Sequence, residues 1–137
     1  MADFMVNIDV DDLPRALAFY QSAFDLKIGR RFGADIVELV GSSSPIYLLA
    51  KPAGSAAFQG ADQRRDYSRH WTPVHLDFVV GDISAAVERA TAAGAKLEAP
   101  VKSSIWGDLA PMSDPFGHGF CLVQFRNRGY DEIADPS

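Results

Sequence analysis

The sequence predicts an α+β fold built from two tandem βαβββ modules. The first observation is an internal repeat, in which VNIDVDD at residues 6–12 aligns with LDFVVGD at residues 76–82, so that Asp12 and Asp82 lie 70 positions apart. The second is the alternation of apolar side chains in both segments, which is typical of strands with one buried face. The third is an apolar helical pattern that follows each segment at the same spacing.

Each repeated strand leads into a predicted helix. The first helix has an apolar face formed by Leu13, Leu17, Tyr20 and Phe24. The second repeats this face with Ile83, Val87 and Ala90. Gly94 is placed to end the second helix, because glycine adopts the left-handed conformation of a helix C-terminus without steric cost. Asp12 and Asp82 are expected to cap the helices by accepting hydrogen bonds from first-turn N–H groups.

Strand signals follow each helix and complete the modules. In the first module we expect strands at residues 26–32, 36–40 and 46–50. In the second module we expect strands at residues 96–98, about 103–109 and 120–125, with a turn at Asp114-Pro115-Phe116-Gly117 before the last. The single domain then consists of module one at about 4–50, a linker at about 51–72, module two at about 73–126 and a C-terminal tail at 127–137. Tyr130 is a candidate to dock this tail.

The linker is less regular than the modules. Arg65 and Arg69 are four residues apart, and Asp62 and Asp66 interleave with them. We therefore expect a solvated helical turn with local ion pairs rather than an anion-binding site.

Composition excludes several classes of protein. Thirteen basic and eighteen acidic side chains give a formal net charge of -5, which disfavours nucleic acid as a partner. No apolar run approaches the ~18 residues of a membrane helix, so no membrane partner is expected. The single cysteine, Cys121, excludes an intrachain disulfide. The N-terminal residues do not resemble a signal peptide, and we expect a soluble, cytoplasmic protein.

Two motifs carry a family resemblance. DLPRALAFY at residues 12–20 follows the first strand, and DPFGH at residues 114–118 precedes the last. With the tandem modules, these motifs resemble the vicinal oxygen chelate superfamily, which includes glyoxalase I, extradiol dioxygenases, fosfomycin-resistance enzymes and bleomycin-resistance proteins. The resemblance implies a curved mixed sheet around a central cleft and a homodimer. It leaves open whether the cleft forms within one chain or across the dimer.

The resemblance also implies where a divalent metal ion would be held. Metal-dependent members use His or Glu on the first and last strands of each module, and the matching positions here are Met5, Tyr47, His75 and Cys121. Only His75 keeps a usual ligand, whereas a catalytic site normally needs about three. We therefore expect no divalent metal cofactor.

Strand alternation identifies the side chains that face the expected cleft. The predicted ligand-binding residues are Met5, Asn7, Asp9, Tyr47, His75, Asp77, Trp106 and Cys121. A few polar groups on mostly apolar walls are typical of a small-molecule site. Asp9, Asp77 and the net negative charge favour a neutral or cationic guest. The leading hypothesis is metal-independent binding of a small aromatic or cationic molecule, as in the bleomycin-resistance branch.

Other interpretations stay open. The chain can be a glyoxalase-like lyase or isomerase that uses either a soft metal such as copper or His75 with Asp77 as general base. It can also be a structural or regulatory partner with an empty cleft. Each residue has a structural interpretation as well: His75 hydrogen-bonded to Asp77 or Asp9, Cys121 as a small buried hydrophobe, and Trp106 as strand core. His70 and Trp71, just before the second module, are candidates for a lid.

Overall fold

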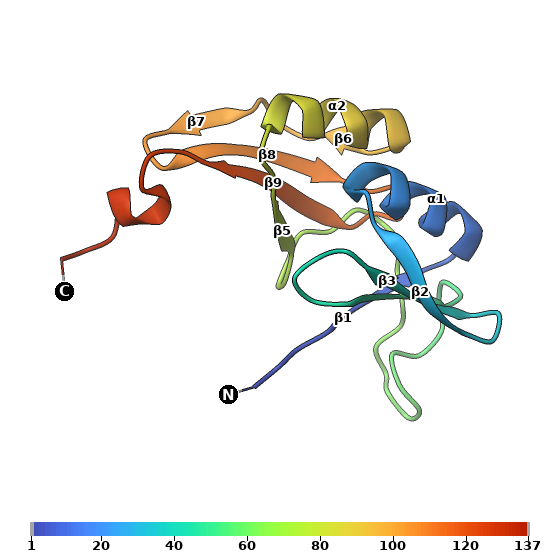
Figure 1. Ribbon diagram of the computed structural model, residues 1–137. Helices are drawn as coiled ribbons and strands as arrows, with labels where there is room; N and C mark the ends of the chain where they lie inside the picture. Colours follow the sequence, from blue (N-terminus) through green and yellow to red (C-terminus); the bar gives the residue numbers. More distant parts are fainter. Residues whose placement is uncertain (1, 137) are drawn as a thin grey trace. The chain divides into compact units, whose positions relative to one another are not determined.

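The computed structural model describes residues 2–136 and confirms the α+β fold class (Figure 1). The chain divides into two compact units, with the boundary between Ser68 and Arg69. Each unit has its own mixed sheet and one α-helix. Within residues 2–136, no helix is both long and apolar enough to cross a bilayer.

The first unit contains the predicted βαβββ module. Its elements are β1 (Val6–Val10), α1 (Leu13–Phe24), β2 (Lys27–Phe32), β3 (Ile36–Val40) and β4 (Ile46–Ala50). The strand order in the sheet is β1-β4-β3-β2. β1 runs parallel to β4, and the other pairs are antiparallel. The predicted strands are therefore confirmed.

Helix α1 begins and ends as the sequence chemistry requires. The Asp12 carboxylate accepts a hydrogen bond from the Arg15 N–H at 3.1 Å, and Pro14 occupies the first turn, where its missing N–H costs little. The helix ends at Asp25, which adopts a left-handed conformation with φ of 53°. The apolar face of α1 and the inner face of the sheet form the buried core, whose members are Val10, Leu13, Ala16, Phe19, Tyr20, Ala23, Val37, Leu39, Ile46 and Leu48.

The second unit repeats this arrangement with one added strand. Its elements are β5 (Leu76–Val79), α2 (Ile83–Ala93), β6 (Lys96–Leu97), β7 (Lys102–Ser104), β8 (Gly107–Ser113), β9 (Gly119–Phe125) and a 3-10 helix, η1 (Gly129–Glu132). The strand order is β5-β9-β8-β6, with β7 paired to β8. β5 runs parallel to β9, as β1 does to β4.

Helix α2 confirms the predicted caps. The Asp82 carboxylate accepts a hydrogen bond from the Ala85 N–H at 3.1 Å. The Ile83 N–H donates to Oε1 of Gln124 on β9 at 2.8 Å, which ties the start of the helix to the sheet. At the other end Gly94 has φ of 120°, and its N–H bonds to the last turn.

The predicted strand at 103–109 is wrong. The segment folds back on itself, and Ile105 and Trp106 form the turn between β7 and β8. Gly107 permits this geometry, because an added Cβ would lie 2.2 Å from the Gln124 carbonyl oxygen on β9. Trp106 therefore lies in a turn rather than in a strand.

The expected helical turn in the linker is also wrong. Residues 51–72 contain no helix and instead fold back through an isolated bridge between Ala56 and Arg64. Arg65 forms its ion pair with Asp9 on β1 rather than with the neighbouring Asp62 or Asp66. A long-range contact thus replaces the expected local ones.

The C-terminal tail is docked by Tyr130. Its ring lies 4.9 Å from the rings of both Trp106 and Phe125, measured between centroids. The three rings form an aromatic cluster that joins η1 to β9 and to the turn before β8.

Candidate functional site

Alternation along β5 separates the two faces of the second sheet. Leu76 and Phe78 are half-buried, whereas Asp77 and Val79 are exposed. Asp77 stands opposite Cys121 of β9 in the strand register. Because paired residues project to the same face, Asp77 and Cys121 share the face opposite to Leu76 and Phe78.

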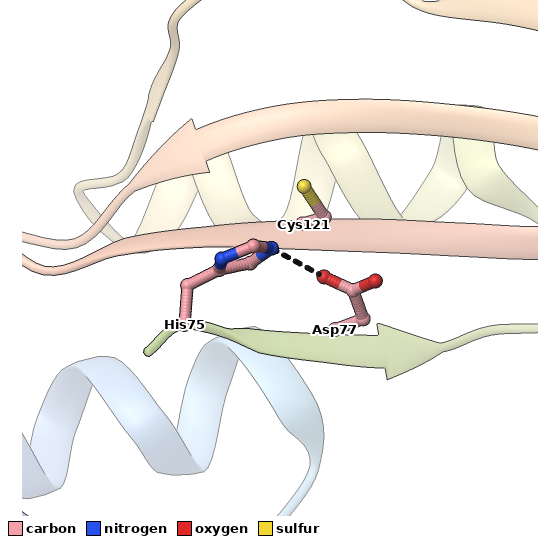
Figure 2. Close-up of side chains that lie close together, drawn as sticks. All are labelled: His75, Asp77 and Cys121. Atoms are coloured by element: carbon pink, nitrogen blue, oxygen red, sulfur yellow. Dashed lines mark ion pairs between the residues drawn. The ribbon is translucent and has the colours of Figure 1, made fainter. Parts of the chain in front are cut away.

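Three predicted site residues meet on this face. One ligand atom each from His75, Asp77 and Cys121 lies within 4.8 Å of the other two. His75 Nε2 is 3.3 Å from Asp77 Oδ1, one of the two partners, Asp77 or Asp9, that the sequence suggested for it. Figure 2 shows His75, just before β5, and Asp77, within β5, beside Cys121 on β9. The His75 and Asp77 side chains are 41% and 38% exposed and thus accessible to a ligand.

The Cys121 thiol stays protonated at neutral pH. The residue is only 5% exposed, and this burial is the main reason that the pKa of its thiol rises to about 11. The negative charge of Asp77 and a hydrogen bond to it raise the pKa further. Cys121 therefore acts as a small buried group that donates toward Asp77, rather than as a thiolate.

Trp71 belongs to the same face, and the sequence suggested only a lid role for it. A Cβ added at Gly119 would lie 2.3 Å from Cδ2 of the Trp71 indole, so the ring occupies the space of a side chain at that position. Gly119 and Cys121 are two residues apart on β9 and therefore project to one face. The Trp71 and His75 ring centroids are 5.5 Å apart. The only sequence signal for this contact is a glycine at position 119.

The equivalent face of the first sheet is centred on Tyr47. Asn7 of β1 and Glu38 of β3 stand opposite Tyr47 from its two sides. The Tyr47 hydroxyl donates to Glu38 Oε2 at 2.9 Å and accepts from Arg30 Nη2 at 3.0 Å. Met5, just before β1, is 60% exposed. Asn7 and Tyr47 are thus neighbours, but Tyr47 is already held by two charged side chains.

Glu38 is a site residue that sequence reasoning missed. It is 8% exposed and accepts hydrogen bonds from the Arg30 backbone N–H, Nε and Nη2 at 3.0, 3.1 and 2.7 Å. These hydrogen bonds lower the pKa of Glu38 to about 2, and the side-chain bonds from Arg30 make the largest contribution. The glycine at position 29 makes room, because its Cβ would lie 2.5 Å from Glu38 Oε1. The charge of Glu38 is therefore balanced within the protein.

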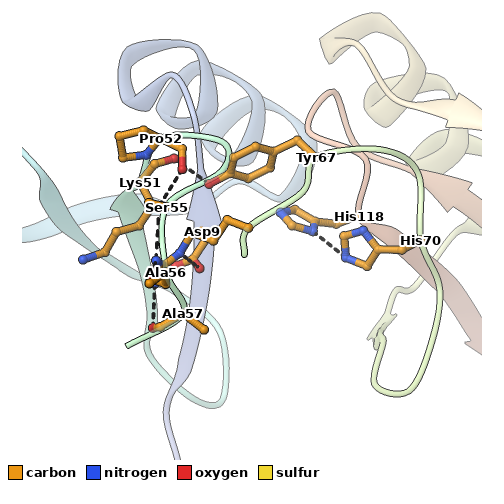
Figure 3. Close-up of polar contacts among 10 residues, drawn as sticks. Asp9, Lys51, Pro52, Ser55, Ala56, Ala57, Tyr67, His70 and His118 are labelled. Carbon is orange, nitrogen blue, oxygen red and sulfur yellow. Dashed lines mark hydrogen bonds and ion pairs between the residues drawn. The ribbon is translucent and has the colours of Figure 1, made fainter. Parts of the chain in front are cut away.

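The predicted cleft residue Asp9 is also balanced. Arg65 Nε lies 2.6 Å from Asp9 Oδ2, and the same guanidinium donates to the carbonyl oxygens of Ala56 and Ala57 and to the Ser55 hydroxyl. Figure 3 shows Asp9 beside the loop that carries Ser55, Ala56 and Ala57. The negative charge of Asp9 thus organises a loop of its own unit.

Two further histidines contact each other in the second unit. His70 Nε2 and His118 Nδ1 are 3.1 Å apart (Figure 3), and the His118 N–H donates to Asp114 Oδ1 at 2.9 Å. Trp106 is placed with Phe125 and Tyr130. A role for Trp106 in binding stays a prediction.

The donor set does not fit the hard divalent ion that the family resemblance implies. Ions such as Mg²⁺ and Mn²⁺ take mainly carboxylate and other oxygen ligands. The cluster in the second unit offers one carboxylate, one imidazole and one buried thiol, which is a soft ligand. In the first unit, the matching positions are an exposed thioether and a phenol bound to Glu38 and Arg30.

Comparison with known proteins identifies relatives along almost the whole chain. Residues 5–123 match the family described as glyoxalase-like domain. An uncharacterized protein of Mycobacterium tuberculosis is 33% identical over 132 residues, which cover 93% of this chain and 77% of that protein.

Solved structures show the same fold at low sequence identity. A variant of the fosfomycin resistance protein FosX from Listeria monocytogenes, complexed with Mn(II) and 1S,2S-dihydroxypropylphosphonic acid, has a TM-score of 0.73 and 16% identity, covering 98% of this chain and 99% of that one. Lactoylglutathione lyase from Agrobacterium tumefaciens has a TM-score of 0.61 and 17% identity, covering 90% and 92%. At such identities the likeness concerns the fold alone.

Proposed function

The chain belongs to the glyoxalase-like domain family of the vicinal oxygen chelate superfamily, and within it we propose that this protein binds a small aromatic or cationic molecule without a metal ion. One observation carries the proposal. Three of the four positions that match the family's metal ligands hold Met5, Tyr47 and Cys121, and the Tyr47 hydroxyl is bonded to Glu38 and Arg30. The fourth, His75, is paired with Asp77.

The character of the exposed groups supports binding of a small molecule. The second unit places an imidazole, a carboxylate and a half-buried indole on one sheet face. A few polar groups beside an aromatic surface orient a ligand while apolar contact supplies most of the affinity. Asp77 gives this face a negative group, and its ion pair is with a histidine rather than with an arginine.

Calorimetric titration tests the proposal directly. Proflavine and ethidium, two planar aromatic cations, are titrated into protein that has been dialysed against EDTA. The expected result is binding with a Kd below millimolar that does not change when Mn²⁺ or Zn²⁺ is added. Binding that appears only with added metal, or no binding below millimolar, would contradict it.

The contact between His75 and Asp77 favours one alternative, a glyoxalase-like lyase or isomerase. At 3.3 Å from Nε2, the Asp77 carboxylate can hold the imidazole in a fixed orientation. His75 would then remove a proton from a carbon next to a carbonyl group, with no step assigned to a metal.

Proton exchange with solvent separates this alternative from pure binding. The hemithioacetal of methylglyoxal and glutathione is incubated with the protein in D₂O, and NMR follows loss of the C–H signal. The lyase interpretation requires exchange above the uncatalysed rate that disappears in H75A and persists in H118A, a control that leaves His75 and Asp77 intact. Exchange at the uncatalysed rate in the wild type excludes it.

The homodimer implied by the family resemblance is part of the proposal. Light scattering coupled to size exclusion measures the mass directly, and the expected value is twice the 14.9 kDa of one chain. A mass of one chain would contradict it.

A further inference from the structure

Trp71 is held in a defined position on the second sheet. The His70 N–H donates to the Gly117 carbonyl oxygen at 2.8 Å, and the Gly119 N–H donates to the His70 carbonyl oxygen at 2.8 Å. These two bonds fix the backbone next to Trp71 against the start of β9. The indole then lies directly on the backbone of Gly119, with its Cδ2, Cε2 and Cγ all within 2.7 Å of where a Cβ would stand.

This position places an aromatic ring beside the polar cluster. One side of the indole is covered by Gly119, and the His75 ring meets it at an interplanar angle of 68°. Trp71 as a whole remains half-buried rather than buried. An indole that rests on Gly119 with part of its surface accessible can serve as a stacking surface for a second flat ring.

The charges next to Trp71 select the type of ring. In the first unit, taken by itself, the carboxylates of Asp9 and Glu38 are each bonded to an arginine, Arg65 and Arg30 respectively. Asp77 in the second unit instead lies beside the His75 imidazole and the Cys121 thiol. An indole face attracts cations, and the nearby carboxylate adds to that attraction.

We infer that Trp71 is the stacking platform of the second unit and that its ligand is a planar aromatic cation whose charge lies toward Asp77. Gly119 is the residue that makes the platform possible, because a larger residue would displace the indole. This inference rests on the proposed function and makes it more specific. It names the class of ligand, a planar aromatic cation, and the residue on which its ring stacks, Trp71.

Binding to matched variants tests the inference. Proflavine is titrated into the wild type, W71F, W71L, G119A and the control W106F. We expect W71L to raise the Kd about tenfold or more, as loss of a cation–π contact would, and W71F to raise it less than about threefold. G119A should weaken binding, W106F should not, and tetraethylammonium, which has the charge without a ring, should bind at least about tenfold more weakly than proflavine.

An NMR measurement on the wild-type protein tests the inference even if the variants fold poorly. Tryptophan indole N–H resonances are assigned by their absence in W71F and W106F, and proflavine is then added to wild-type protein. We expect the Trp71 resonance to shift, because a stacked ring changes its magnetic environment, while that of Trp106 stays in place.

The outcomes separate the inference from the proposed function. If the wild type binds proflavine, and W71L binds it equally well or the Trp71 resonance does not move, the platform is wrong and the proposed function stands. If the wild type binds neither proflavine nor ethidium, both fail.

Discussion

Arg65 and Asp9 are 56 residues apart in the sequence, yet Arg65 Nε lies 2.6 Å from Asp9 Oδ2. The arginine side chain is 15% exposed, and its other donors bind the loop at residues 55–57. One guanidinium thus connects β1 to the segment that follows the first module. This loop is consequently an ordered part of the first unit rather than a solvated linker.

Removal of this guanidinium should destabilise the first unit. We expect R65M to lower the free energy of unfolding by about 2 kcal/mol, because it leaves several partly buried acceptors without a charged donor. R65K should recover only part of the loss, since lysine cannot reach Asp9 and the loop carbonyls together. Urea unfolding measures the change, with the exposed neighbour Arg64 as control in R64M. Equal stability of R65M and R64M would show that the contact contributes nothing.

Glu38 should stabilise the protein in a defined pH range. Its pKa is lowered from 4.5 to about 2 in the folded protein, so its stabilisation is fully present above pH 4.5 and is lost as the pH falls toward 2. E38Q should therefore be less stable than the wild type at pH 6, and the difference should shrink between pH 4.5 and 2. Urea unfolding at several pH values measures it. The exposed Glu88 offers a control, E88Q, for which we expect no comparable trend.

Gly29 should tolerate a methyl group poorly. In G29A the new Cβ would meet Glu38 Oε1 at 2.5 Å, and Glu38 cannot yield without losing its bonds to Arg30 and Tyr47. We expect a loss of about 2 kcal/mol of stability. G81A is a matched control, because nothing lies within 4 Å of a Cβ at that position. Similar melting temperatures for the two variants would show that the Glu38 side chain can move away from a new Cβ without a loss of stability.

Cys121 should react slowly with thiol reagents. With a pKa of about 11, roughly one thiol in a thousand is ionised at pH 8, and burial limits access further. We expect alkylation by iodoacetamide about a hundredfold or more slower than for free cysteine. D77N should accelerate the reaction only a few-fold, because burial, the main cause of the raised pKa, remains. Fast alkylation of the folded wild type would contradict the assignment, and alkylation in urea provides the reference rate.

Local chemistry made much of the fold predictable. Asp12 and Asp82 cap helices and Gly94 ends one, because each acts on groups within a few residues. The apolar alternation likewise placed β1 and β5, since a strand with one buried face repeats every second residue. The same alternation put His75 and Asp77 on one face, although it left Asp9 open as another partner of His75.

The errors and omissions arise from contacts between distant segments. Arg65 was assigned to nearby aspartates, but it bonds to Asp9 on another strand. Glu38 was missed and Trp71 was suggested only as a lid, because their partners, Arg30 and Gly119, are adjacent to them only after the chain has folded. The turn at Ile105 and Trp106 was missed because both are typical strand residues.

The turn from Asp114 to His118 determines which side chains the candidate site contains. It joins Ser113 of β8 to Gly119 of β9, and Asp114 Oδ1 holds it by accepting from the Phe116 and His118 N–H groups. Inserting or deleting one residue here would shift β9 by one place and turn Phe120 or Leu122 toward Asp77 instead of Cys121. The length of this short turn, more than its amino-acid composition, therefore determines which side chains of β9 can face Asp77.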